Sequence, residues 1–208
     1  LAPISIAGVV QAARERGLPV GCELDLFTQT ISNLKHTIGY QPALLAITGT
    51  NGKTTVTALT GQLVERAGRS VVLAGNIGPT LLDTLQAHLV AETLPEVWVL
   101  ELSSFQLDGV AGFEPTAATV LNITQDHLDW HGDMAAYAAA KARIFGEHGV
   151  MVLNRDDAAV MAMRPAPPAK LPKGTPKPEP RKCSETTCIF NGLRRSGLSE
   201  PYQSIASW

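Results

Sequence analysis

Residues 43–55 read ALLAITGTNGKTT and combine an apolar run, a glycine-containing turn and a Lys-Thr pair. The apolar run, residues 43–48, predicts a buried strand, and residues 53–67 predict a helix that follows the turn directly. Such a turn lets backbone N–H groups approach phosphate oxygens, and the helix N-terminus adds partial positive charge. The stretch therefore predicts a strand–loop–helix phosphate site.

This loop departs from the usual G-x-x-x-x-G-K-[ST] spacing, because Ile47 stands where the first glycine would be. Its glycines are Gly49 and Gly52. Lys53 can reach the β- and γ-phosphates of a nucleotide, and the hydroxyl of Thr54 can bind Mg²⁺. The alternative is a left-handed glycine turn that binds nothing. The position between a strand and a helix favours phosphate binding.

Other short apolar runs predict further strands. They are rich in Val, Leu and Ile, and they cover residues 70–74, 97–102, 118–123 and 150–154. They are apolar on both faces, which is typical of parallel strands covered by helices. Residues 80–90 and 134–145 predict helices, the second with Asp133 as its N-cap. We therefore expect an open α/β fold with a mostly parallel sheet flanked by helices.

The helix predicted over residues 53–67 has an apolar stripe that we expect to face the sheet. The stripe consists of Val56, Leu59, Leu63 and Val64, with Gly68 just past the helix end. Upstream, we expect one helical piece near residues 6–16, followed by the stretch LPVGCELDLF.

Polar residues follow the strand predicted over residues 97–102. Glu101 lies near its carboxyl end, where ligands of open α/β sheets bind. A carboxylate there can hold Mg²⁺ opposite the phosphate loop, whereas the alternative is a surface glutamate. Ser103, Ser104 and Gln106 come next and could bind a ligand by hydrogen bonds. Asn76, in the turn AGNIGPT, is either a turn former or a ligand contact.

A cluster of acids and histidines, NITQDHLDWHG, follows the strand predicted over residues 118–123. One histidine, His127, could contact a metal or a phosphate. Zinc is disfavoured because no cysteine or third histidine lies near His127 and His131. A polar surface loop is the alternative for both histidines.

Lys141 lies on the apolar stripe of its predicted helix, four residues after Tyr137 and three before Ile144. One explanation is a lysine whose stem is packed while its ammonium stays in water. The other is a partly buried amine with a lowered pKa that is available for chemistry.

The composition sets limits on the class of protein. The 208 residues are 45% hydrophobic, enough for one medium domain with appendages. No apolar run approaches the roughly 18 residues of a membrane span, and no secretory signal pattern opens the chain. Three cysteines make no disulfide framework, so we expect a cytoplasmic protein. The net charge of −2 gives no general case for nucleic-acid binding.

Several motifs occur in a specific order: AITGTNGKTT, GNIG, LELSSFQL, LNITQDHLDWHG and then Y-x-x-x-K. This order resembles the central ATPase domain of the Mur ligase family over about residues 18–163. GTNGKT is shared with folylpolyglutamate synthases. ELSSFQL points instead to the members that add D-glutamate to UDP-N-acetylmuramoyl-L-alanine.

The resemblance implies roles for the matching residues. Those that would hold ATP are Gly49, Thr50, Asn51, Gly52, Lys53, Thr54 and Thr55. Thr54 and Glu101 would bind one Mg²⁺, while His127 and a carbamate on Lys141 would bind a second. The catalytic set would be Lys53, His127 and Lys141, and the UDP-muramoyl substrate would be contacted by Asn76, Ser103 and Gln106.

The implied reaction is ATP-dependent amide formation through an acyl phosphate, with small molecules as the partners. We expect no nucleic-acid or membrane partner, and a monomer. One alternative is a folylpolyglutamate synthase-like ligase. The other is a non-catalytic nucleotide-binding module whose basic tail docks an acidic partner or nucleic acid.

Charge and proline content change near Met163. Residues 1–163 hold 9 Lys and Arg against 16 Asp and Glu, whereas residues 164–208 hold 8 against 3 and eight of the 14 prolines. We expect residues 1–40 to be a remnant of an N-terminal UDP-binding domain with its linker. Residues 41–163 would be an incomplete ATP-binding domain, and residues 164–208 a disordered or out-of-frame tail. The chain would then be a ligase fragment that is inactive by itself.

Overall fold

The computed structural model describes residues 6–165 and contains one five-stranded sheet. The strands are β1 (Ala43–Thr48), β2 (Val71–Gly75), β3 (Val97–Glu101), β4 (Ala117–Val120) and β5 (Val150–Leu153). Their order across the sheet is β2-β3-β1-β4-β5, and every neighbouring pair is parallel. The prediction of an open parallel α/β sheet is confirmed.

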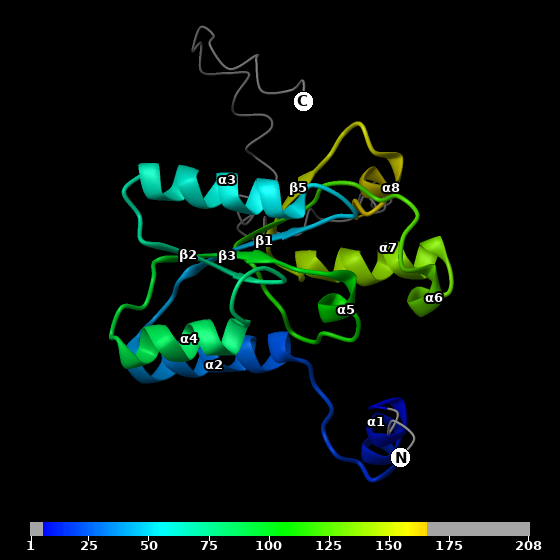
Figure 1. The fold of residues 1–208 in the computed structure, drawn as a ribbon, viewed down its shortest axis with the longest axis horizontal. Coiled ribbons are helices and arrows are strands. Elements are labelled where there is room, and N and C mark those ends of the chain that lie inside the picture. The colour runs from blue at the N-terminus through cyan, green and yellow to red at the C-terminus, as the bar shows by residue number, and fades with distance from the viewer. Residues whose placement is uncertain (1–5, 166–208) are drawn as a thin grey trace, which may run out of the picture. The chain divides into compact units, whose positions relative to one another are not determined.

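Helices cover both faces of this sheet (Figure 1). The helices of the described residues are α1 (Ile6–Glu15), α2 (Glu23–Ile38), α3 (Lys53–Arg66), α4 (Leu81–Val90), α5 (Ser104–Leu107), α6 (Leu128–His131), α7 (Met134–Ala142), the 3-10 turn η1 (Arg143–Phe145) and α8 (Ala158–Met161), of which α1 does not pack on the sheet. Helix α3 lies on one side of the sheet, and α2 and α4 lie together on the other. None of the helices in residues 6–165 is long and apolar enough to cross a membrane.

The predicted strands match the observed ones except near the ends. All five residues of β3 are buried, as expected for a central strand. In β5, by contrast, Val152 is 54% exposed, because β5 lies at one edge of the sheet that residues 6–165 form. Strand β4 ends at Val120, three residues before the predicted end, because the chain then turns to contact the phosphate loop.

Helix α3 faces the sheet with only part of the stripe that we predicted. Val56 and Val64 pack against the core as expected. Leu59 is 50% exposed and Leu63 is 55% exposed, so this part of the prediction is wrong. Thr57 and Gly61 are the buried residues. Gly61 lies against Leu73 of β2, where an added Cβ would stand 2.6 Å from Leu73 Cδ1. The two valines and these smaller residues therefore form the contact line, and the leucines project away from it.

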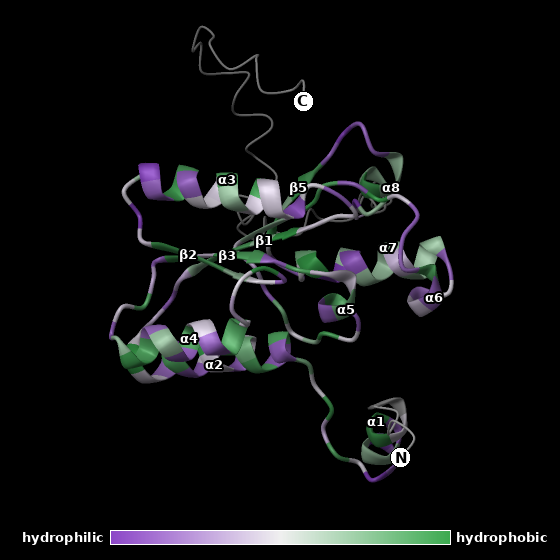
Figure 2. Ribbon diagram, viewed as in Figure 1, coloured by the Kyte–Doolittle hydropathy of each residue, from purple (hydrophilic) through white to green (hydrophobic). Residues whose placement is uncertain are grey.

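The N-terminal region contains a second helix, α2, which the sequence analysis missed. Its N-cap is Cys22, whose backbone N–H donates to Asp25 Oδ2 at 2.8 Å, and its C-cap is the left-handed Gly39. Leu24 and Phe27 are fully buried in the main core, where the Phe27 ring packs edge-on against Trp98. Figure 2 shows hydrophobic residues along the strands and on α2 and α4. Helix α2 is thus part of the core that supports the sheet.

Helix α7 begins where we predicted, with the Asp133 carboxylate accepting from the N–H of Ala136 at 2.8 Å. It ends at Ala142, and η1 completes the segment that we had assigned to one helix over residues 134–145. Ile144 and Phe145 on this turn are buried in the main core. Helix α7 is therefore anchored at its C-terminal end by two apolar side chains.

Candidate functional site

Because every strand of the sheet is parallel, the loops that follow the strands open at one edge. This edge holds the phosphate loop (residues 49–52) after β1, Asn76 after β2, Glu101 at the end of β3 and the histidine loop (residues 124–131) after β4. The residues that the sequence singled out therefore lie along one edge of the sheet.

The phosphate loop folds closely against the segment after β4. Gly49 has a φ of +154°, and a Cβ there would stand 3.0 Å from Leu121 Cβ, which explains the requirement for glycine. Gly52 is the N-cap of α3, and Lys53 opens the helix. The Lys53 ammonium donates to the carbonyls of Gly49 and Thr50, each at 3.0 Å. Its positive charge therefore lies over the loop that would receive phosphate.

The first turn of α3 presents hydroxyl groups beside this charge. Thr54 and Thr55 are exposed there. The N–H groups of a first helical turn have no partner within the helix, so they can donate to an anion. The backbone, Lys53 and the exposed hydroxyls together have the donor chemistry of a nucleotide phosphate site.

Glu101 is 1% exposed at the end of β3, and only one of its two carboxylate oxygens has a hydrogen-bond partner among the described residues. Its Oε1 accepts from Asn76 Nδ2 at 3.1 Å, but Oε2 is buried with no hydrogen-bond partner among the described residues. Gly75 allows the two strands to approach, since a Cβ at this residue would lie 2.2 Å from the carbonyl oxygen of Glu101. A buried carboxylate oxygen without a partner is costly unless a cation completes it.

These features fit Mg²⁺, which prefers oxygen ligands and keeps several waters. Glu101 supplies a free oxygen and Thr54 an exposed hydroxyl. Within residues 6–165, no three His, Cys, Asp or Glu side chains gather as a metal cluster. The donor set therefore suits a cation that is held jointly by protein, water and phosphate oxygens, rather than by an all-protein cage.

Lys141 is 2% exposed, so of the two explanations the one with its ammonium in water is wrong, and the lysine is buried. Its Nζ donates to Thr48 Oγ1 at 3.2 Å and to the Gly49 carbonyl at 3.0 Å, and lies 4.9 Å from the centre of the Tyr137 ring. Burial lowers the pKa of Lys141 to about 8; the charge of Lys53 lowers it further, and Asp126 partly opposes this. The neutral amine is thus accessible near neutral pH.

His127 lies in the loop after β4 with a left-handed backbone, φ +51°. Its Nε2 is 3.3 Å from Asp126 Oδ2, and its ring lies 4.7 Å from that of Phe105. The His127 side chain is 44% exposed, so it can receive a ligand. His131 stacks on Phe105 instead, and its Nε2 is buried with no hydrogen-bond partner in the described part of the chain.

Ser103 and Gln106 are occupied with each other. Ser103 is the N-cap of α5, where its hydroxyl accepts from the N–H of Gln106 at 3.3 Å. The side-chain carbonyl of Gln106 accepts from the backbone N–H and the hydroxyl of Ser103, each at 3.0 Å. The nearby Ser104 is buried, and its hydroxyl has no partner among residues 6–165. The structure thus gives Ser103 and Gln106 a capping role.

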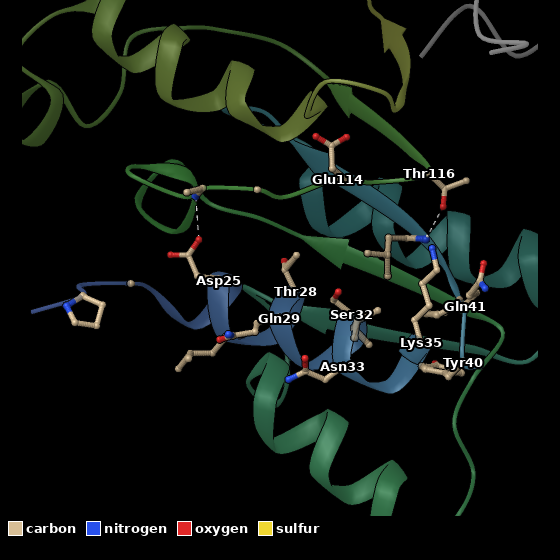
Figure 3. Close-up of a pocket in the computed structure, with 18 of the residues that line it drawn as sticks. Asp25, Thr28, Gln29, Ser32, Asn33, Lys35, Tyr40, Gln41, Glu114 and Thr116 are labelled. Atoms are coloured by element: carbon tan, nitrogen blue, oxygen red, sulfur yellow. Dashed lines mark hydrogen bonds between the residues drawn. The ribbon is translucent and has the colours of Figure 1, made fainter. Parts of the chain in front are cut away.

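A groove of about 1140 Å³ lies elsewhere, along α2 and the loop before β4 (Figure 3). It is lined by Pro42 and Leu44 at the start of β1 and by Thr116 just before β4. These residues mark the amino ends of the strands, whereas the phosphate loop follows their carboxyl ends. The groove is therefore separate from the candidate site.

Two residues at the site were missed as candidates. Asn122 bonds both to the backbone N–H and to the carbonyl of Asn51, and the Tyr137 hydroxyl lies 3.2 Å from Thr50 Oγ1. The sequence analysis used Tyr137 only to place Lys141, alone and in the Y-x-x-x-K motif, although tyrosine can bury its ring and still bond through its hydroxyl. The pairing of Asn122 with Asn51 joins residues 71 positions apart, so no local spacing could indicate it.

Known proteins with similar sequences and structures indicate the family of this chain. A sequence profile of the Mur ligase middle domain matches residues 47–173. The UDP-N-acetylmuramoylalanine–D-glutamate ligase of Albidiferax ferrireducens is 66% identical over 167 residues, covering 80% of this chain and 33% of that protein. The ligase of the same name from Cupriavidus pinatubonensis is 55% identical over 193 residues, covering 91% of this chain and 37% of that protein. The chain spans about a third of the length of these relatives.

The match over 91% of the chain extends beyond Met163, where we expected the resemblance to fade, so that expectation is wrong. Among solved structures, a UDP-N-acetylmuramoyl-L-alanyl-D-glutamate–2,6-diaminopimelate ligase aligns with a TM-score of 0.55 and 30% identity. That alignment covers 68% of this chain and 32% of the other. Because the profile matches more than half of its residues, this chain belongs to the Mur ligase family.

Proposed function

We propose that this chain is the ATP-binding part of a ligase that adds D-glutamate to UDP-N-acetylmuramoyl-L-alanine, a step in making peptidoglycan precursors. The main observation in support is that three residues lie at the carboxyl edge of one parallel sheet. They are Lys53, Glu101 with one unpartnered carboxylate oxygen, and the buried Lys141. The identity of 55–66% to curated D-glutamate ligases supports this substrate class.

In this proposal, residues 49–55 bind the phosphates of ATP, and the ammonium of Lys53 offsets their charge. Thr54 and Glu101 would hold one Mg²⁺, and His127 with a carbamate on Lys141 would hold a second. Bound Mg²⁺ would supply neutralisation of phosphate charge. The unpartnered oxygen of Glu101 supports the first of these sites, and the exposed ring of His127 supports the second.

The reaction would have two steps. The carboxylate of UDP-N-acetylmuramoyl-L-alanine attacks the γ-phosphorus of ATP, and ADP leaves, which produces an acyl phosphate. The amine of D-glutamate then attacks the acyl carbon, and inorganic phosphate leaves after the amine has lost a proton. Lys53 and the N-terminus of α3 position the phosphates, since phosphoryl transfer depends mainly on positioning and charge.

Carbamylation of Lys141 would turn a buried amine into a carboxylate-like oxygen ligand. Carbon dioxide reacts with the neutral amine, and the pKa of about 8 supports a supply of that form. Incubation with ¹³C-bicarbonate should give a carbamate signal by ¹³C NMR that Lys141→Arg lacks. A spectrum unchanged by this substitution would remove the carbamate from the proposal.

Asn76, Ser103 and Gln106 remain proposed contacts of the UDP-muramoyl substrate. Asn76 is exposed and is already oriented by Glu101, which supports a contact near the metal. Ser103 and Gln106 would have to contact the substrate while capping α5.

We also propose the division of the chain into residues 1–40, 41–163 and 164–208, and a cytoplasmic location. The tail predicted over residues 164–208 lies, from residue 166 on, outside the described residues. We further propose that the chain alone does not catalyse turnover.

Titration of the 208-residue chain with MgATP tests the proposal. We expect binding by the unchanged chain and at least tenfold weaker binding by Lys53→Met. Lys35→Met on the exposed face of α2 is the control and should bind normally. UDP-N-acetylmuramoyl-L-alanine, and not a folate, should then change the affinity for ATP. A response to folate instead would favour a folylpolyglutamate synthase-like ligase, and absence of ATP binding would refute the ATP-binding role.

A further inference from the structure

The phosphate loop is held by one residue of the segment after β4. Asn122 Oδ1 accepts from the N–H of Asn51 at 2.8 Å, and Asn122 Nδ2 donates to the carbonyl of Asn51 at 3.0 Å. The carbonyl of Asn122 also accepts from the N–H of Thr50 at 3.0 Å. The side chain of Asn122 thus makes the pair of bonds that a neighbouring strand would make, and it fixes the orientation of the Asn51 peptide groups.

The same segment continues the contact toward the histidine loop. Thr50 Oγ1 accepts from the N–H of Thr124 at 3.0 Å and lies 3.2 Å from the Thr124 carbonyl oxygen. The Thr50 hydroxyl is also 3.2 Å from that of Tyr137 on α7. His127 follows Thr124 by three residues. The loop that would bind phosphate and the loop that carries His127 are therefore joined directly.

These bonds also decide which donors remain for an anion. The N–H groups of Thr50 and Asn51 donate to Asn122, so they cannot turn toward a phosphate while these bonds hold, and contacts of these two residues with ATP would use their other groups. The N–H groups at the start of α3 do not contact Asn122, and their position in the first helical turn leaves them without partners inside the helix. The contact with Asn122 thus directs phosphate toward the start of the helix and Lys53.

We propose that Asn122 is a positioning residue that locks the phosphate loop to the histidine loop, so that nucleotide binding and the placement of His127 are coupled. The inference rests on the proposed ATP-binding function. Asn122 acts through the backbone of Asn51 and does not touch the reacting atoms. Removing its two side-chain bonds should let the loop leave the binding-competent conformation and should lower nucleotide affinity accordingly.

A matched control is available in the same region. Asn154, just after β5, donates from Nδ2 to the carbonyl of Leu121 at 2.8 Å, and its Oδ1 accepts from the N–H of Asp156 at 3.0 Å. Asn154→Ala and Asn122→Ala therefore each remove two side-chain hydrogen bonds, and one of the two lost from Asn154 reaches Leu121, but only Asn122 contacts the phosphate loop. Asn122→Gln keeps both polar groups and moves them by one methylene.

The experiment titrates each 208-residue chain with ADP and Mg²⁺ and compares thermal midpoints. We expect Asn122→Ala and Asn122→Gln to bind ADP roughly thirtyfold more weakly, the size expected for two lost hydrogen bonds. Asn154→Ala should bind like the unchanged chain even where its thermal midpoint falls as far. Equal losses of affinity in the Asn122 and Asn154 variants would mean a merely structural role and would overturn the proposal.

Amide hydrogen exchange supplies a readout that general destabilisation does not reproduce. In the unchanged chain, ADP should slow exchange across residues 124–131, and this slowing should persist in Asn154→Ala and disappear in Asn122→Ala. If the unchanged chain binds ADP and the Asn122 variants bind it equally well, the positioning role of Asn122 is refuted while the ATP-binding proposal stands. If the unchanged chain binds no ADP, both proposals fail.

Discussion

Replacing the buried Lys141 by methionine should change stability in a strongly pH-dependent way. Lowering the pKa of Lys141 from 10.5 to about 8 makes the protonated amine unfavourable by roughly 3 kcal/mol in the folded chain, because each pH unit is worth about 1.4 kcal/mol. Methionine removes this penalty but also the two hydrogen bonds to Thr48 and Gly49, which are worth about 1 kcal/mol each. Lys141→Met should therefore be about 1 kcal/mol more stable than the unchanged chain at pH 7.

The sign reverses in alkaline solution. Between pH 8 and 10.5 the unfolded chain holds the Lys141 proton more tightly than the folded chain does, so the unchanged chain gains stability as the pH rises. This gain amounts to about 2.5 kcal/mol between pH 7 and pH 10. Lys141→Met lacks this gain and should be the less stable chain at pH 10.

Urea unfolding followed by tryptophan fluorescence, to which the buried Trp98 contributes, measures this difference. The buffers should be free of carbon dioxide, so that no carbamate forms, and Lys35→Met on the exposed face of α2 is the control. The reasoning is refuted if the difference between Lys141→Met and the unchanged chain is the same at pH 7 and pH 10. A constant difference would mean that the folded chain does not discriminate against the protonated amine.

Three further outcomes are expected. Gly75→Ala should lower the free energy of unfolding by more than about 2 kcal/mol, because its Cβ would stand 2.2 Å from the Glu101 carbonyl oxygen. Gly78→Ala, which meets no atom within 4 Å, should cost only about 1 kcal/mol in the same urea titration. Glu101→Gln should abolish the gain in ADP affinity that Mg²⁺ produces, measured by calorimetry with and without the metal; an unchanged gain would exclude Glu101 as a ligand. Asp157→Ala should cost about 1–2 kcal/mol at pH 7, because Asp157 caps α8 and accepts from the N–H of Ile123. These hydrogen bonds lower the pKa of Asp157 below its usual 3.8. The stability that they contribute is therefore present above pH 3.8 and is lost as the pH falls through the pKa of the folded chain. Urea titrations at pH values from 7 to 2 would measure this loss.

Most of the sheet could be predicted from the sequence because its strands are short apolar runs separated by helices. The strand over residues 43–48 was predicted with its observed bounds. Helix α2 was missed, since its polar residues obscure the periodic apolar positions Leu24, Phe27 and Ile31. The exposed Leu59 and Leu63 were misplaced because the size of the apolar side chains suggested a buried face, whereas the contact requires the small Gly61.

The sequence by itself determined the phosphate loop, the parallel α/β class and the position of Glu101 at a strand end, because each depends on residues that are neighbours in the chain. Only the tertiary structure decided that the Lys141 ammonium is buried on the Gly49 carbonyl and that Asn122 holds Asn51. These contacts join residues 92 and 71 positions apart. Their geometry arises when parallel strands bring distant loops to one edge, and burial at that edge then sets the chemistry of the lysine.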